Sequence, residues 1–439
     1  MHMSVTDVDR YVDANPFGDA AFPVTPAQAV FLDDVAPPAG PDHADHILHV
    51  ELTRRIAPAR VATAVRRTML RHDGLRLRLA HDGSRWWQSC ADPGDPPFES
   101  HDLSGVGDDE VEPAVAAVAA GARTSTTAPV RVEHLRLGGG RRDRMLVICN
   151  PLVVDGLSLA LVLDDLQGWL DGNGPAAPTA PYQIWATALD RYAREAELAE
   201  QIPFWLAQRR REAVPVDRSE GAGSTGPRAV LTTTLSGAAT DAATRAAGAA
   251  GLDLADLLLA AVAATVARWQ GGAHCTVAVA SPGRRSPVPG IDVSRTIGRF
   301  EFRYPLRLHV DPDLTGPSAA AEVRRQVAAV PLDGLGHGLL LRTRGDERLA
   351  DVAAPQVGFS YLAGSDATRP AGLLVPVTAA PERDPAGGRP YLLDVAATVV
   401  DGAVRFAFHH DPAVHDASTI GRLADEIGAR LCGPGVDAG

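Results

Sequence analysis

Two kinds of hydrophobic spacing alternate along this chain of 439 residues. Apolar positions that recur every three or four residues predict amphipathic helices, and strict alternation predicts half-buried strands. Helices are expected at 57–71, 109–123, 158–170, 240–251, 254–270 and 417–431, with further helical sequence in 178–208. Strands are expected at 47–52, 75–79, 130–137, 145–150, 229–235, 275–280, 304–310, 357–362, 391–399 and 404–409. The mixture predicts an α/β fold with mixed sheets.

Local start and turn signals agree with these elements. Thr25 followed by Pro26 and Gln28 has the pattern of a capping box at a helix start. The triplet Gly138–Gly140 joins two predicted strands without a following helix, so a hairpin turn is favoured over a phosphate-binding loop. Asp401-Gly402 predicts a second hairpin.

The length of the chain predicts two domains of about 200 residues each, since one compact core rarely grows so large. The segment 212–227 is rich in Gly, Ser, Pro and charged residues and is expected to be a linker. We therefore expect an N-terminal lobe at 1–211 and a C-terminal lobe at 228–439. Both halves use the same strand and helix patterns, which suggests an internal pseudo-duplication.

Charge and cysteine content narrow the possible partners. The net charge is −12, from 42 basic and 54 acidic side chains, and no basic block stands out, which disfavours nucleic acid and anionic membranes. The four cysteines are scattered without a C-x-x-C pair: Cys90, Cys149, Cys275 and Cys432. We expect a cytoplasmic location, no zinc site and no disulfide framework. The N-terminus lacks an apolar secretion segment.

The segment Asn150-Pro151-x-x-x-Asp155-Gly156 closes a predicted strand and is spaced like a His-His-x-x-x-Asp-Gly signature. On this basis the chain resembles the condensation-domain superfamily of nonribosomal peptide synthetases. Other blocks resemble family motifs in the same order, those of the second half being closest to the epimerization branch: 23–28, 71–76, 283–284, 292–298, 303–305, 334–340 and 359–362.

The resemblance implies a fold and a substrate class. It implies two chloramphenicol-acetyltransferase-like lobes in a V, with a central tunnel between them. Carrier proteins would deliver substrates tethered to phosphopantetheine, and no bound cofactor or metal is expected. It also implies a buried structural ion pair between Asp155 and Arg284. Gly156 is expected to provide a special backbone conformation or a close approach.

The same resemblance removes the usual proton-transfer groups. Pro151 stands at the position of the family's catalytic histidine, and proline has no side-chain proton to exchange. Ala280 stands where the epimerization branch has a glutamate, four residues before Arg284. Ordinary epimerization is therefore disfavoured.

Four other side chains are candidates to replace the family's catalytic histidine, and three of them have a plainer alternative. Cys149 would be a thiol nucleophile or a packing cysteine. Asn150 would orient a substrate carbonyl or cap the strand end. Ser158 would donate into the tunnel or begin a helix. His337 lies in a family-like block with an expected tunnel location.

The run His409-His410-Asp411 with His415-Asp416 imitates the missing motif and a metal site. Adjacent histidines on a strand point to opposite faces, so surface histidines and a helix cap are the favoured interpretation.

Two hypotheses about function follow. The first is an atypical condensation-like enzyme that acts in trans on a carrier-tethered acyl or peptidyl group, by transfer or cyclization, using proximity in place of a histidine base. The second is a non-catalytic module that recruits a carrier protein or a tailoring oxygenase. An inactive remnant is a third.

Overall fold

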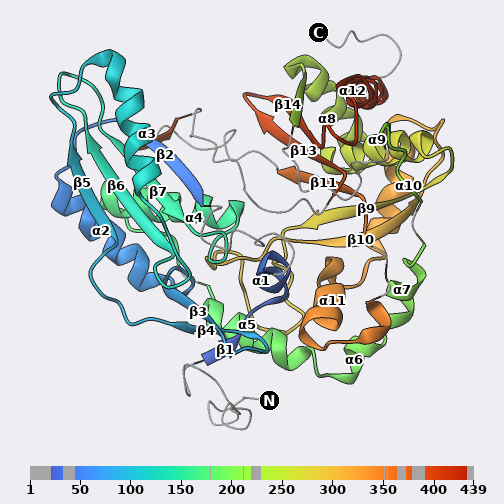
Figure 1. Cartoon of the computed structure of the whole chain (residues 1–439), viewed down its shortest axis with the longest axis horizontal. Coiled ribbons are helices and arrows are strands. Elements are labelled where there is room, and N and C mark those ends of the chain that lie inside the picture. Colours follow the sequence, from blue (N-terminus) through green and yellow to red (C-terminus); the bar gives the residue numbers. More distant parts are fainter. Residues whose placement is uncertain are drawn as a thin grey trace. The chain divides into compact units, whose positions relative to one another are not determined.

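The computed structural model describes residues 21–32, 45–177, 179–210, 212–218, 229–350, 352, 354–362, 372–377 and 391–432. The chain forms two compact units, coloured along the sequence in Figure 1. Unit 1 contains 1–193, 284–301 and 370–387, and unit 2 contains 194–283, 302–369 and 388–439. Two stretches of the second half thus belong with the first unit. The expected linker lies partly outside the described residues, so it stays a prediction, as do the V and the tunnel.

Unit 1 is built on a five-stranded mixed sheet in the order β12-β2-β7-β6-β5. Its strands are β2 (His46–Leu52), β5 (Phe98–Asp102), β6 (Val130–Arg136), β7 (Arg144–Cys149) and β12 (Leu374–Pro376). Only β5 and β6 run parallel. The glycine triplet joins β6 to β7 as predicted, and its three residues have positive φ. A second sheet, β1-β4-β3, contains β1 (Ala21–Pro23), β4 (Trp86–Cys90) and β3 (Leu77–His81).

Helix α3 covers one face of the larger sheet. The helices described in unit 1 are α1 (Pro26–Val30), α2 (Pro58–Arg71), α3 (Val111–Gly121), α4 (Gly156–Asp171) and α5 (Tyr182–Tyr192). Helix α3 packs its Val111, Val115 and Ala119 onto Leu146 and Ile148 of β7. Because alternate residues of a strand face opposite sides, Cys149 and its β2 partner His46 belong to the other face.

One predicted strand begins later than expected. Leu75 lies in a 3₁₀ turn, Asp73–Arg76, and β3 starts only at Leu77. The Asp73 carboxylate accepts backbone N–H groups from Gly74 at 3.0 Å and from Tyr182 at 2.9 Å. These bonds hold the turn against the strand preference of its residues.

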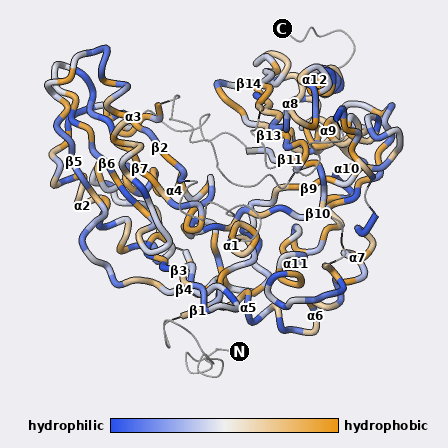
Figure 2. The backbone as a smooth tube through the Cα atoms, viewed as in Figure 1, coloured by the Kyte–Doolittle hydropathy of each residue, from blue (hydrophilic) through white to orange (hydrophobic). Residues whose placement is uncertain are grey.

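Unit 2 contains a six-stranded sheet in the order β10-β9-β11-β13-β14-β8. Its strands are β8 (Ala229–Leu235), β9 (His274–Ser281), β10 (Phe302–His309), β11 (Val357–Leu362), β13 (Leu393–Val400) and β14 (Ala403–His410). Its helices are α6 (Ala196–Ala199), α7 (Ile202–Ala207), α8 (Gly237–Ala249), α9 (Leu254–Trp269), α10 (Gly316–Ala328), α11 (Leu335–Gly338) and α12 (Ala417–Cys432). Helix α9 is hydrophobic along most of its length (Figure 2), and it is buried as its composition predicts. The hairpin at Asp401-Gly402 is confirmed.

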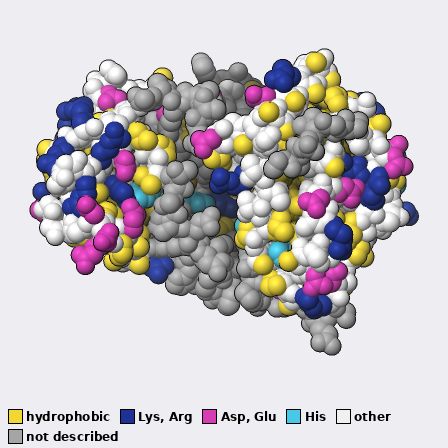
Figure 3. Space-filling model, turned by 90° about the horizontal axis from the view of Figure 1, so that it is seen from above, with side chains coloured by type: hydrophobic (Ala, Val, Ile, Leu, Met, Phe, Trp, Pro, Cys, Tyr) yellow, Lys and Arg dark blue, Asp and Glu magenta, His cyan; other side chains and the backbone are white. Residues whose placement is uncertain are grey.

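Among the described residues, no single helix has the length and apolar character needed to cross a membrane. Helices α8 and α9 meet that test only as a pair, which is bent by 103°. On the face shown in Figure 3, basic and acidic side chains are interspersed over each unit.

Candidate functional site

The segment after β7 forms a tight turn built from Asn150. The Asn150 side-chain oxygen accepts the Leu152 N–H at 3.0 Å, and its carbonyl accepts the Val153 N–H at 3.0 Å. Pro151 is buried inside this turn. The Gln28 amide, positioned by the capping box with Thr25, donates to the Leu152 carbonyl at 2.9 Å. The Asn150 bonds fit the plainer of its two predicted roles, and a functional role of Asn150 stays a prediction.

Asp155 caps helix α4 and gathers several donors around one buried carboxylate. Its side chain is about 3% exposed. Oδ1 accepts the Ser158 N–H at 2.7 Å and the Arg284 guanidinium at 3.2 Å. Oδ2 accepts the N–H groups of Phe300 at 3.0 Å and Glu301 at 3.2 Å. We call Asp155, Ser158, Arg284 and these two amides the Asp155 cluster.

Arg284 is bound on several sides within this cluster. One terminal nitrogen donates to the carbonyls of Val293 at 2.8 Å and Thr296 at 2.7 Å, and the other reaches Asp155 and Ser158. The guanidinium lies over the Phe300 ring, 4.1 Å from its centroid. Burial lowers the pKa of Arg284, and the Asp155 carboxylate opposes this. The ion pair that the resemblance implied is present, and it ties the segment 284–301 to the start of α4.

Ser158 and Cys149 are poorly suited to chemistry. The Ser158 hydroxyl donates to the Gly298 carbonyl at 2.7 Å and accepts from Arg284 at 2.9 Å and from the Gly298 N–H at 3.1 Å. All its bonding capacity is used. The Cys149 thiol is fully buried, and this burial raises its pKa to about 12. A thiol of that kind is a packing group, because the thiolate is the nucleophile.

Gly156 does not have the role expected of it. It is exposed, its φ is not positive, and a Cβ added there would meet nothing within 4 Å. Any small residue would fit at this first position of α4. Near this cluster, Gly298 does have a steric reason to be glycine, because an added Cβ would overlap the Tyr182 ring.

Two predicted positions belong to unit 2. Ala280 lies in β9 opposite Arg303. His337 lies in α11 with its ring 5.1 Å from that of Trp205, and its Nε2 has no hydrogen-bond partner among the described residues. Burial lowers the pKa of His337 to about 4. The functional roles of these two residues stay predictions.

Two residues beside the turn escaped prediction, His46 and Arg299. His46 begins β2 and pairs in register with Cys149. Burial, and then the Arg299 charge, lower its pKa to about 4. Arg299 donates to the carbonyls of Pro151 and Ala27, both at 3.1 Å. Only strand register and the return of 284–301 to unit 1 bring them together, so the sequence carried no local signal.

The histidine-rich run in unit 2 is more buried than expected. His410 ends β14 between β13 and β8 and is about 3% exposed, and His415 is fully buried beside Trp269. The interpretation as surface histidines is wrong for both, because β13 and β8 flank His410 and Trp269 of α9 lies against His415. Among the described residues, the group whose ligand atoms lie close enough for a metal is Glu99, His101 and Glu133. Arg131 already pairs with the carboxylates of Glu99 at 3.4 Å and Glu133 at 3.2 Å.

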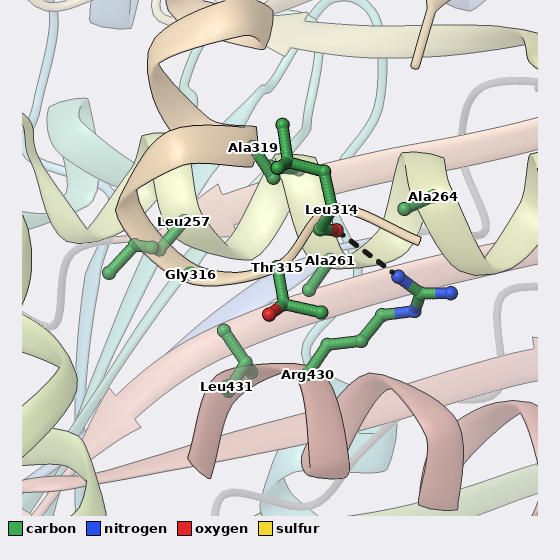
Figure 4. A pocket seen from close by; sticks show the side chains of 10 residues that line it. Leu257, Ala261, Ala264, Leu314, Thr315, Gly316, Ala319, Arg430 and Leu431 are labelled. Carbon is green, nitrogen blue, oxygen red and sulfur yellow. Dashed lines mark hydrogen bonds between the residues drawn. The ribbon is translucent and has the colours of Figure 1, made fainter. Parts of the chain in front are cut away.

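Unit 2 contains two cavities among its described residues. The one in Figure 4, between α9, the start of α10 and Arg430 of α12, has about 10 Å³, the room of one water molecule. A larger hollow of about 360 Å³ lies at the edge strand β8, beside His410 and His415.

The chain matches the family model of the condensation domain over residues 20–431. The chain therefore belongs to the condensation-domain family. Among curated proteins, it is 27% identical over 433 residues to one of the linear gramicidin synthase proteins of Brevibacillus parabrevis, and the match covers 93% of this chain and 8% of that protein. The chain thus spans less than a tenth of that relative.

Solved structures support the same fold. The epimerization domain from the third module of tyrocidine synthetase B matches with a TM-score of 0.81 and 21% identity, covering 94% of this chain and 96% of that one. The teicoplanin X-domain in its complex with OxyB matches with a TM-score of 0.70 and 22% identity, covering 96% and 94%. The predicted mixed α/β fold of this family is confirmed.

Proposed function

We propose that this chain binds an acyl or peptidyl group that a carrier protein presents in trans on a phosphopantetheine arm, within nonribosomal peptide biosynthesis. Its family and its relatives among peptide synthetases support this substrate class. The intact Asp155 cluster supports it as well, because it preserves the local architecture around the start of α4.

Within that role, the geometry favours a non-catalytic module that recruits a carrier protein or a tailoring oxygenase. The supporting observation is the state of the side chains at the turn: Pro151 has no proton to exchange, the Ser158 hydroxyl is fully bonded, and the Cys149 thiol is buried with a raised pKa. The teicoplanin X-domain, a neighbour in fold, forms a complex with OxyB, and we propose a protein partner for this chain by analogy.

Transfer or cyclization in trans is the second candidate function, and His46 favours it. Its imidazole is partly exposed and forms no hydrogen bond with a described residue. The lowered pKa keeps it neutral at physiological pH, so it has a lone pair to accept a hydrogen bond from a substrate. Orientation of two tethered groups would supply the remaining acceleration.

The test uses carrier proteins loaded with acyl and aminoacyl groups, mixed with the wild type and analysed by intact mass and by binding. A recruitment module should bind loaded carrier more tightly than unloaded carrier and leave its mass unchanged. Release or transfer of the acyl group that is lost in His46→Ala, but kept in the exposed-site control His81→Ala, would establish the enzymatic function instead. The variants C149A, N150A, S158A and H337A test the other candidates. If loaded carrier neither binds nor reacts, both functions are rejected.

A further inference from the structure

Arg299 is a cation held in one orientation beside the turn. Its Nε donates to the Ala27 carbonyl and one terminal nitrogen, Nη1, donates to the Pro151 carbonyl. The guanidinium also lies over the Phe31 ring, 4.5 Å from its centroid. Two other segments of unit 1 therefore fix it, and a fixed planar donor loses little entropy on binding a ligand.

Arg299 has no ion-pair partner among the described residues. Within the described residues it forms no ion pair within 4.0 Å, and its second terminal nitrogen, Nη2, donates no hydrogen bond. Arg284, from the same segment, pairs with Asp155 and also donates to two carbonyls. Burial lowers the pKa of Arg299, while Glu301 and Asp155 oppose this through space. A partly desolvated cation without an ion-pair partner favours the binding of an anionic group of a ligand.

His46 adds a hydrogen-bonding group without adding a second charge. It pairs in register with Cys149, two residues before the Pro151 carbonyl that accepts from Arg299, and its ring nitrogens hydrogen-bond to no described residue. Together the two side chains offer one positive charge, bonded to the Pro151 carbonyl, and one neutral imidazole on the strand that pairs with Cys149. That combination suits a singly charged planar group more than a phosphate, which normally needs several cations.

We propose that Arg299 and His46 bind a carboxylate carried by the acyl group of the tethered substrate, at the position that Pro151 leaves without a functional side chain. This inference rests on the proposed function, because it assumes a pantetheine-linked acyl group. It adds the chemical class of that group, a dicarboxylic or otherwise acidic acyl chain.

The test compares two thioesters of equal chain length by calorimetry, S-succinyl-pantetheine and S-butyryl-pantetheine. The wild type should bind the succinyl compound about ten- to a hundredfold more tightly, as expected for a charge-assisted hydrogen bond. Arg299→Gln should abolish this preference, so that the variant binds the two thioesters equally. Arg78→Gln is the matched control, because Arg78 is exposed in β3, and it should keep the preference.

Each other outcome overturns a specific claim. Equal binding of both thioesters to the wild type, or a preference that survives in R299Q, would reject the carboxylate site and leave the proposed function standing. Failure of both thioesters and of loaded carrier to bind would reject the proposed function as well. The phosphate of the phosphopantetheine arm is the other group that Arg299 could bind, and free phosphopantetheine tests it. If R299Q weakens the binding of phosphopantetheine and the succinyl group adds nothing, Arg299 binds the phosphate and the carboxylate site is rejected.

A second variant keeps the inference testable if R299Q does not fold. All 42 basic residues of the chain are arginines, so Arg299→Lys introduces its first lysine. An amine-reactive acetylating reagent, followed by peptide mass analysis, then reports on this position alone besides the N-terminus. Succinyl-pantetheine should slow acetylation at position 299 several-fold, and butyryl-pantetheine should not. Equal protection by both compounds would contradict a carboxylate site.

Discussion

Arg284 and Arg299 come from one segment of unit 1, yet their surroundings differ. In the Asp155 cluster, a buried carboxylate meets Arg284, the Ser158 N–H and two further backbone amides at 2.7–3.2 Å. Around Arg299 the protein supplies carbonyl oxygens and an aromatic face, but no carboxylate among the described residues lies within 4.0 Å. An ion pair formed within the protein stabilises the fold. A fixed cation that has no carboxylate partner among the described residues is available to a ligand.

The two halves of the segment 150–156 also differ in how they are bonded. Asp155 and Arg284 each depend on the other, because removal of either side chain leaves the other charge buried without its partner. Pro151 carries no such constraint, because its bond to Arg299 is made by its backbone carbonyl, which accepts at 3.1 Å.

The largest expected effect comes from breaking the Asp155 cluster. Asp155→Ala should lower the free energy of unfolding by about 3–5 kcal/mol, because the Arg284 charge stays buried without its carboxylate. Urea unfolding of the purified protein measures this. Arg284→Met in the D155A background should recover part of the loss, since no unpaired charge remains. The exposed Asp164→Ala is the control and should cost less than about 1 kcal/mol. Equal costs for D155A and D164A would contradict the structural role of the cluster.

A smaller effect is expected from the two glycines near the cluster. Gly298→Ala should destabilise unit 1 by about 1–3 kcal/mol, because the new methyl group overlaps the buried Tyr182 ring. Gly156→Ala, at the open first position of α4, should be neutral or stabilising by about 0.4–1 kcal/mol. The thermal midpoints of the two variants give the comparison. If G156A is destabilising, the close approach that the family resemblance implied for Gly156 is supported after all.

Local features of the fold were predictable from sequence, and long-range ones were not. The capping box of Thr25 and Gln28 and both glycine hairpins follow from residues within a few positions of each other. Leu75 was misjudged because Asp73 binds amides more than a hundred residues away.

The candidate site shows the same division. The Asp155–Arg284 pair was reached only through the family resemblance. His46 and Arg299 were missed because nothing near them in the sequence indicates that β2 lies beside β7, or that 284–301 returns to unit 1. His410 and His415 were placed at the surface for a related reason, since their burial depends on Ala229 of β8 and on Trp269 of α9.

The smallest and most specific effect concerns pH and the Arg299 side of the comparison. His46 has a pKa of about 4 in the folded protein against an ordinary value of 6.5. The unfolded chain therefore binds more protons in this window, so stability is complete above pH 6.5 and falls as the pH drops toward 4. His46→Gln should remove this contribution, at most about 3 kcal/mol, and flatten the fall in urea-unfolding stability, while the exposed-site variant His81→Gln should not.

Arg299→Gln separates the two causes of that shift. Burial is the larger cause and remains in the variant, so the pKa of His46, followed by NMR titration, should rise from about 4 without reaching 6.5. Arg78→Gln should leave it unchanged. A His46 pKa that does not respond to R299Q would mean that the imidazole and the guanidinium do not share one environment. The two arginines would then still differ in their partners, but Arg299 would act without His46.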